Sequence, residues 1–186
     1  MNTLDEAQML QRCRVGDTQA VETLVERYQG SIFRLALSIL EEPDEAEEVA
    51  QDSLIAALKG LRSFQGKASF KTWLFAIAIN RCRGRLRQRQ RRERLGNVLN
   101  WFIQNHTATS LQLEEQVMRG ERDRQIRLAV NALNEKRRLP VILRYYHELP
   151  IAEISQVLGV SERTVHNRLR AAHLELFGRL DKLERW

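Results

Sequence analysis

Residues Ile151–Arg170 read IAEISQVLGVSERTVHNRLR, a stretch that predicts two short helices joined by a tight turn. Apolar residues recur on one face of each helix: Ile151, Ile154 and Leu158 in the first, and Val165, Leu169 and Ala172 in the second. Gly159 can adopt the positive φ that such a turn requires, and Ser161 can cap the second helix. The stretch therefore predicts a helix-turn-helix.

The face of the second helix that lies opposite Val165 is polar and basic. It carries Arg163, Asn167 and Arg170. Arginine can bond guanine in bidentate fashion and asparagine can bond adenine in the same way, so this face can read base pairs in the major groove of DNA. The flanks of the face suit phosphate contacts and hold Thr164, His166 and Arg168. The alternative interpretation is a helical hairpin whose charged face is only solvated.

The rest of the chain is also predicted to be helical, because no segment shows the period-two alternation of a strand. Helices are expected near the N-terminus, from Asp17, over Ser31–Leu40, from Pro43 to Leu61, and over Phe70–Arg91. Small and polar residues over 95–115 favour a flexible linker. We therefore expect an all-α protein with two small helical domains, at residues 1–94 and 116–186, of which the second contains the helix-turn-helix. The apolar run VLNWFI at 98–103 is either a short helix resting on a domain or a docking segment.

Charge is distributed unevenly along the 186 residues, whose net charge is +6. Residues Arg81–Arg94 hold eight arginines and one acid, whereas Glu41–Asp52 holds seven acids and no basic residue. The arginine run suits a phosphate backbone, although a solvated tail would have the same composition. The acidic run instead favours a basic protein partner.

Aromatic and basic residues alternate between the two charged runs, in FQGKASFKTW at Phe64–Trp73. Three aromatic rings, two lysines and a flexible glycine can form a platform on which unpaired bases stack. A tryptophan such as Trp73, taken alone, is more often a core residue.

In their order along the chain, these blocks resemble the extracytoplasmic-function (ECF) group of bacterial RNA polymerase sigma factors, in the sigma-70 family. Residues Ala20–Ile39 resemble the start of the first domain, and Asp44–Leu61 resembles the helix that binds core polymerase. Residues Phe64–Arg83 resemble the loop and helix that capture the melted minus-ten element, and Leu133–Leu169 is similar to the domain that reads the minus-thirty-five element. The resemblance implies a cytoplasmic sigma factor that binds core RNA polymerase and directs promoter-specific transcription initiation, with no catalytic site and no cofactor.

The same resemblance implies roles for individual residues. The implied core-polymerase contacts are Glu47, Glu48, Gln51 and Asp52. The implied contacts with opened promoter DNA are Phe64, Lys67, Phe70, Lys71, Trp73, Asn80, Arg81, Arg83 and Arg85. An anti-sigma factor is a further implied partner. The chain departs from the family pattern at Gly84, often an aspartate, and at Asn134, often a proline, and Pro140 is expected to kink the helix that contains it.

Other classes of protein fit the sequence less well. The four histidines lack HExxH spacing, Gly60–Ala68 (GLRSFQGKA) departs from a phosphate-binding loop, and no RNA-binding motif is recognisable. His166 and His173 are therefore read as surface or phosphate-contacting histidines rather than metal ligands, and the isolated Cys13 and Cys82 as ordinary thiols. No run of apolar residues approaches the ~18 that span a bilayer, and the N-terminus does not resemble a signal peptide, so we expect no insertion into a membrane. The remaining alternative is a conventional helix-turn-helix repressor or activator that binds a palindrome as a dimer.

Overall fold

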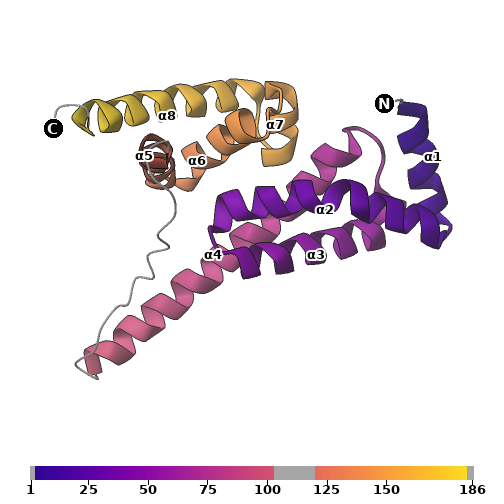
Figure 1. Ribbon diagram of the computed structural model, residues 1–186, viewed down its shortest axis with the longest axis horizontal. Coiled ribbons are helices and arrows are strands. Elements are labelled where there is room, and N and C mark those ends of the chain that lie inside the picture. The colour runs from indigo at the N-terminus through magenta and orange to yellow at the C-terminus, as the bar shows by residue number, and fades with distance from the viewer. Residues whose placement is uncertain (1–2, 103–119, 184–186) are drawn as a thin grey trace. The chain divides into compact units, whose positions relative to one another are not determined.

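A computed structural model gives the structure of the protein and describes residues 3–102 and 120–183 (Figure 1). No strand occurs in these two ranges, so the predicted all-α class is confirmed. The spacing of Cα atoms divides the chain into two compact units: Met1–Arg87 with Ala152–Ser161, and Gln88–Ile151 with Glu162–Trp186. This division places the first helix of the helix-turn-helix in the unit that contains most of the N-terminal residues. The domain boundaries at 1–94 and 116–186 remain a prediction.

The helices follow one another along the chain as follows. The N-terminal part contains α1 (Thr3–Arg14), α2 (Thr18–Leu40), α3 (Pro43–Gly60), the 3-10 turn η1 (Leu61–Ser63) and α4 (Phe70–Phe102). The C-terminal part contains α5 (Gly120–Asn131), α6 (Glu135–Val141), the π-helical segment η2 (Ile142–Tyr146), α7 (Ile151–Leu158) and α8 (Glu162–Leu183).

Helix α2 is one continuous helix where the sequence predicted two. Asp17 caps it, since the Asp17 carboxylate accepts a hydrogen bond of 3.1 Å from the amide of Ala20. The buried residues of α2 then follow one stripe through its whole length: Ala20, Leu24, Tyr28, Ile32, Leu35, Ala36, Ile39 and Leu40. Gly30 does not interrupt the helix because the apolar stripe on both sides of it packs against the same core.

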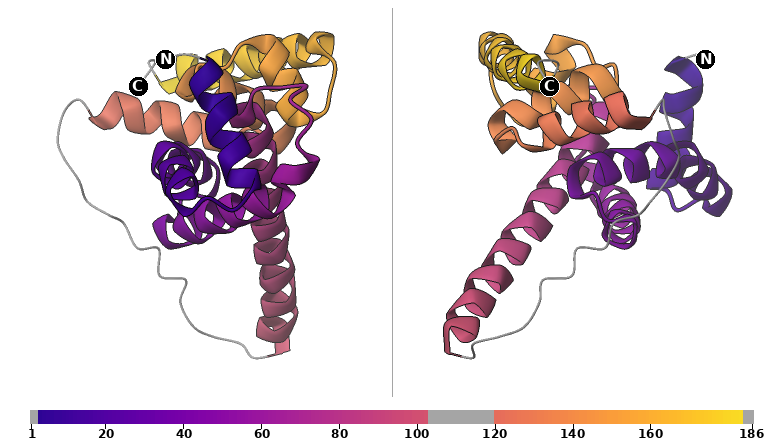
Figure 2. Two further views of the ribbon diagram at one scale, coloured as in Figure 1. Left: turned by 90° about the vertical axis from the view of Figure 1, so that its right-hand side faces the viewer. Right: turned by 60° about the vertical axis from the view of Figure 1, so that its left-hand side comes forward.

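Helix α3 lies beside α2, and the two are seen side by side in both Figure 1 and Figure 2. Pro43 occupies its first turn as predicted, where the missing amide donor costs nothing. Its buried face meets α2 through small and branched residues: Ala46, Val49, Ala50, Ser53, Leu54 and Ala57. Full burial of one Leu or Val side chain contributes roughly 1.5–3 kcal/mol. The α2–α3 pair therefore forms a firm base for the charged residues on its surface.

Helix α4 is longer than predicted, since it continues past Arg91 to Phe102 (Figure 2). The first eight residues of the expected linker are thus helical. Gly96 and Asn97 weaken a helix by about 1 kcal/mol or less each, which is too little to end it. Residues 103–119, including Ile103 of the VLNWFI run, lie outside the described residues, as do the side chains of the run's other residues.

Helix α6 is capped by Asn134 and contains Pro140. The Asn134 side chain accepts a hydrogen bond of 3.1 Å from the amide of Arg137. Pro140 cannot donate to the preceding turn, yet the chain stays helical and widens into η2, where the amide of His147 donates to the carbonyl of Ile142 over 3.2 Å. In place of the expected kink, the chain changes from α-helical to π-helical winding after Pro140.

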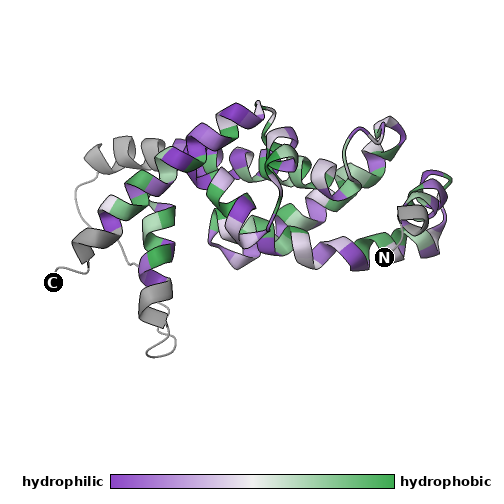
Figure 3. Cartoon of the chain, turned by 90° about the horizontal axis from the view of Figure 1, so that it is seen from above, coloured by the Kyte–Doolittle hydropathy of each residue, from purple (hydrophilic) through white to green (hydrophobic). Residues whose placement is uncertain are grey.

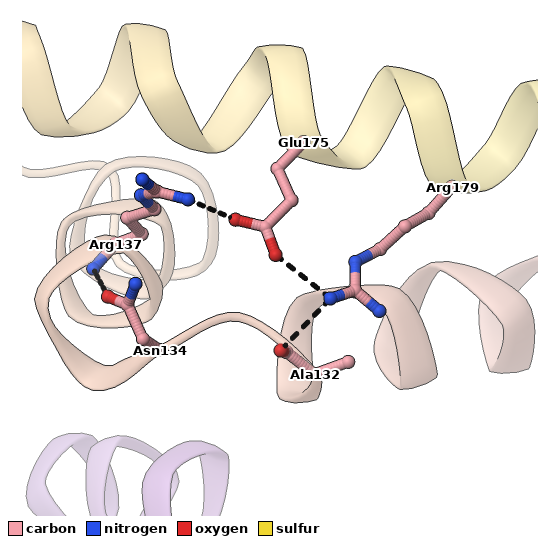
Figure 4. Close-up of polar contacts among 5 residues, drawn as sticks. All are labelled: Ala132, Asn134, Arg137, Glu175 and Arg179. Atoms are coloured by element: carbon pink, nitrogen blue, oxygen red, sulfur yellow. Dashed lines mark hydrogen bonds and ion pairs between the residues drawn. The ribbon is translucent and has the colours of Figure 1, made fainter.

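An ion-pair network links α6 to α8. The Glu175 carboxylate lies 2.5 Å from Arg137 and 2.9 Å from Arg179, and Arg179 also donates to the carbonyl of Ala132 (Figure 4). These bonds hold the pKa of Glu175 below its ordinary value, chiefly through Arg179 and then through Arg137. The network fixes the part of α8 that follows its predicted DNA-reading turns.

Among the residues coloured in Figure 3, each helix carries both hydrophobic and hydrophilic residues. In the ranges that the structure describes, no helix combines the length and the apolarity needed to cross a membrane.

Candidate functional site

The four predicted core-polymerase contacts on α3 fall into two stripes. Glu47 and Gln51 share one stripe, where the Gln51 amide donates to Glu47 over 3.3 Å, and both side chains are exposed. Glu48 and Asp52 share the next stripe and are paired with arginines of α4, Glu48 with Arg85 at 2.7 Å and Asp52 with Arg81 at 3.4 Å. The acidic run and the arginine run are therefore partly each other's partners.

The stripe of Glu47 and Gln51 forms one edge of a groove between α2 and α3 with a volume of about 630 Å³. Most of its lining is apolar: Val25, Phe33, Ala50, Leu54, Ile55 and Leu58. Ile55 is 49% exposed, although it lies between buried positions of the same helix. An apolar groove with Glu47 at its edge suits an amphipathic partner segment that carries a basic residue.

The predicted aromatic platform exists as a cluster at the start of α4. The ring centroids of Phe64 and Trp73 lie 5.0 Å apart, and those of Phe70 and Trp73 lie 5.7 Å apart. Phe64 and Trp73 are half-buried and border a hollow that the Ser63–Ala68 loop also lines. Gly66 has a φ of +70° there, which explains a glycine in this loop.

Phe70 differs from the other two aromatics because it is a core residue, 1% exposed, with an edge-to-face contact to Tyr28 at 5.2 Å. Its predicted contact with DNA is not supported by this position, since no face of the ring is open to a base. Phe70 instead forms the floor on which Phe64 and Trp73 rest. The flanking cations remain accessible: Lys67 is exposed, and Lys71 is half-buried with its ammonium 5.4 Å from the Phe75 ring centroid.

The other predicted promoter contacts lie along α4. Asn80 is exposed and accepts a hydrogen bond of 3.4 Å from Arg83. Arg81, Arg83 and Arg85 are half-buried, and Arg81 and Arg85 face the acids of α3 described above. In the same helix Arg87 is exposed. The arginine run is thus more exposed at Arg87 than at Arg81, Arg83 and Arg85.

The predicted recognition helix is α8, and it buries the face that the sequence indicated. Its anchors Val165, Leu169 and Ala172 are buried, and Gly159 in the preceding turn has a φ of +64°. The predicted reading face is open: Arg163, His166, Asn167 and Arg170 are exposed, and Thr164 and Arg168 are half-buried. His166 therefore belongs to the open face itself, whereas the sequence placed it on the flank.

A hollow of about 410 Å³ beside this face includes His173 and two residues that the sequence analysis missed, Arg144 and Tyr145. Its walls also include His166 and Arg170. The Tyr145 hydroxyl lies 2.8 Å from Nε2 of His173. The only signals in the sequence were the Arg144-Tyr145 pair ahead of the motif and the seven-residue spacing of the two histidines.

Cys13 and Cys82 are both buried and form no disulfide with each other. Burial is the main cause that raises the pKa of the Cys13 thiol. A thiol in this state is a poor nucleophile.

Two family models match the chain in the regions just described. Sigma-70 region 2 matches residues 24–92, and sigma-70 region 4 matches residues 123–176. The first match covers the groove, the aromatic loop and the inner arginine run. The second covers the helix-turn-helix.

Similar proteins of known type cover nearly the whole chain. The RNA polymerase sigma-H factor of Pseudomonas aeruginosa is 30% identical over 88% of both chains. The ECF RNA polymerase sigma factor SigW of Bacillus subtilis is 28% identical over 86% of this chain and 88% of the other. The ECF RNA polymerase sigma-E factor of Escherichia coli is 28% identical over 98% of this chain and 97% of the other.

Solved structures share the fold. CnrH, determined in complex with the cytosolic domain of CnrY, superposes with a TM-score of 0.67 and 23% identity over 94% of this chain and 96% of the other. The sigma factor RpoE of Bartonella quintana, determined with the anti-sigma factor NepR, gives a TM-score of 0.64 and 21% identity over 86% of this chain and 96% of the other.

Proposed function

Because this chain belongs to the extracytoplasmic-function group of sigma-70 RNA polymerase sigma factors, we propose that three separate surfaces carry out its three binding tasks. The protein is a sigma factor that binds core RNA polymerase and directs promoter-specific initiation. The surfaces are the acidic groove of α2 and α3, the aromatic loop with α4, and the exposed face of α8.

The groove is the proposed docking site for core polymerase, and the proposal rests mainly on its presence. A conventional repressor needs no acidic, apolar groove in addition to its DNA-reading helix, whereas a polymerase subunit does. Within the groove Glu47 and Gln51 make the direct contacts, and the apolar lining supplies the buried area. Glu48 and Asp52 contribute less directly, because Arg85 and Arg81 already engage them.

The aromatic loop is the proposed capture site for the melted minus-ten element. Phe64 and Trp73 offer half-buried rings for stacking, and Lys67 and Lys71 offer cations for the phosphates. An unstacked base held there offsets the few kcal/mol that unstacking costs, so strands separate by trapping and not by covalent chemistry. Accordingly, the protein acts without a catalytic site or a cofactor of its own.

The exposed face of α8 is the proposed reader of the minus-thirty-five element. Arg163, Asn167 and Arg170 would contact base edges, with His166 beside them. Thr164 and Arg168 would contact phosphates, and Arg144 and Tyr145 would extend these phosphate contacts across the neighbouring hollow. In this proposal residues 1–94 and 116–186 are the two functional domains.

An anti-sigma factor is the proposed regulator, and the cytoplasm is the proposed location because core polymerase is the partner. Two solved structures with this fold, CnrH and RpoE, contain a bound partner protein, which for RpoE is the anti-sigma factor NepR. The open groove offers an apolar site that such a partner could cover in place of polymerase.

Three binding assays with single variants test the division of tasks. Glu47→Lys should weaken binding to core polymerase, Lys67→Ala binding of the holoenzyme to a single-stranded minus-ten oligonucleotide, and Arg163→Ala binding to duplex minus-thirty-five DNA. When core polymerase is saturating in the oligonucleotide assay, each variant should leave the other two assays near the wild-type level. A variant that lowered all three binding affinities alike would count against separate surfaces.

A further inference from the structure

The guanidinium of Arg14, in α1, reaches the loop that carries the aromatic platform. Its Nη2 donates to the carbonyl of Phe64 over 2.8 Å, and its Nε donates to the carbonyl of Leu61 over 3.3 Å. The remaining nitrogen, Nη1, donates to the Gln11 side chain over 3.4 Å. All three nitrogens of this half-buried side chain are thus engaged, and two of them hold backbone that borders the loop.

The two carbonyls belong to Leu61, the first residue of η1, and to Phe64, which directly follows its last residue. Leu61 also accepts the amide of Phe64, which closes the 3-10 turn, so Arg14 caps that turn from outside. Phe64 then has an extended backbone, and its ring lies on Trp73 and Phe70. The position of the Phe64 ring therefore depends on the carbonyl that Arg14 holds.

We infer that Arg14 is a positioning residue for promoter opening: it fixes the start of the Ser63–Ala68 loop and thereby the ring of Phe64. This inference rests on the proposed role of the loop in capturing the melted strand. Arginine is needed because its planar fork can bond two carbonyls at once, whereas the ammonium of a lysine is a single point of contact.

Arg12 offers a matched control in the same helix. Its guanidinium pairs with Asp17 at 2.8 Å, at the turn between α1 and α2, where Arg14 instead turns to the loop. Loss of Arg12 would disturb the attachment of α1 without touching the loop backbone. The comparison of Arg14 with Arg12 thus separates loop positioning from general support by α1.

The experiment uses the full chain assembled with core polymerase. Its probes are two non-template-strand oligonucleotides, one with the minus-ten sequence of a promoter that the wild-type holoenzyme uses and one with that sequence scrambled. Arg14→Ala and Arg14→Lys should lower the ratio of the two affinities roughly fivefold or more, the low end of what one stacked base contributes. Arg12→Ala should leave the ratio at the wild-type value.

A spectroscopic measurement reports the loop directly. In a chain with Trp101→Phe and Trp186→Phe, Trp73 is the one remaining tryptophan of three, and it lies against Phe64. Acrylamide quenching of Trp73 should rise in Arg14→Ala and Arg14→Lys and stay unchanged in Arg12→Ala.

Two results would overturn the inference in distinguishable ways. If Phe64→Ala lowers the affinity ratio but both Arg14 variants keep the wild-type ratio and quenching, Arg14 does not position the loop. If Phe64→Ala also keeps the wild-type ratio and Lys67→Ala keeps the wild-type affinity for both oligonucleotides, the loop does not capture the strand, and the proposed function of the loop fails together with the inference.

Discussion

The carboxylate of Glu48 lies 2.7 Å from the guanidinium of Arg85, so an acid assigned to polymerase binding neutralises an arginine assigned to DNA binding. Both side chains are partly exposed, at 60% and 33%, and such a surface pair is worth little stability. Its consequence is for binding, because it sets how many free cations α4 presents to DNA.

Glu48→Gln should tighten non-specific DNA binding by the protein. Release of Arg85 adds about one cation to the phosphate-binding set, so the slope of log affinity against log salt should steepen by about one. Fluorescence anisotropy with a duplex at several salt concentrations measures this slope. Asp44→Asn, which removes an exposed acid from the same helix, is the control and should change the slope less. The slope of a Glu48→Gln/Arg85→Gln double variant should return to the wild-type value, and a slope that stays steep would refute the pairing.

Arg163→Ala and Arg87→Ala should affect DNA binding differently. Loss of a base contact should cost about 1–3 kcal/mol on the preferred site and relax specificity there. Arg87 is exposed in the arginine run, so its loss should weaken matched and scrambled sites equally and flatten the salt slope by about one. Competition binding with matched and scrambled duplexes distinguishes the two patterns. Equal losses on both duplexes for Arg163→Ala would show that Arg163 does not read sequence.

Gly66→Ala should impair promoter opening, whereas Gly84→Ala should stabilise the fold. A methyl group added at either position would meet no atom within 4 Å, so space does not decide the outcome. Gly66 has a φ of +70°, where alanine is strained, and its replacement should impair formation of open complexes. Gly84 lies inside α4, where alanine is favoured by about 1 kcal/mol, and its replacement should raise the melting temperature. Permanganate reactivity of promoter thymines and thermal denaturation measure these two effects.

Glu175→Gln should flatten the loss of stability in acid. The pKa of Glu175 is lowered in the folded protein by Arg179 and Arg137, below the 4.5 of an ordinary glutamate. A carboxyl of this kind stabilises the fold above its unfolded pKa, and the contribution disappears as the pH falls through the folded pKa. The wild-type melting temperature should therefore fall more steeply than that of Glu175→Gln below about pH 4.5. Arg137→Gln should show the same change to a smaller extent, and parallel curves for all three proteins would contradict the role of the network.

The sequence predicted the features that depend on local chemistry. The helix start at Asp17, Pro43 in a first turn, Gly159 with a positive φ and the buried anchors of α8 all follow from residue type and spacing. The face of α8 could be assigned in the same way, because helical periodicity fixes which residues point away from the anchors.

Features that depend on packing between distant segments could not be predicted. Nothing local to Phe70 reveals that Tyr28 will cover it, and nothing local to Arg14 reveals the two carbonyls it meets about fifty residues later. The pairing of Glu48 with Arg85 likewise needs the packing of α3 against α4. Helix ends were missed where the signals were weak, as at Gly30 and beyond Arg91.

The most direct test of the central claim is run-off transcription with purified protein, sigma-free bacterial core polymerase and a library of promoter fragments. The wild-type chain and Glu22→Lys, a charge reversal on an exposed residue outside the groove, should both give specific transcripts. Glu47→Lys should abolish them while the protein still binds duplex DNA. No transcript with the wild-type chain, together with tight binding of a palindrome by the protein alone, would contradict the claim that this chain acts as a polymerase subunit.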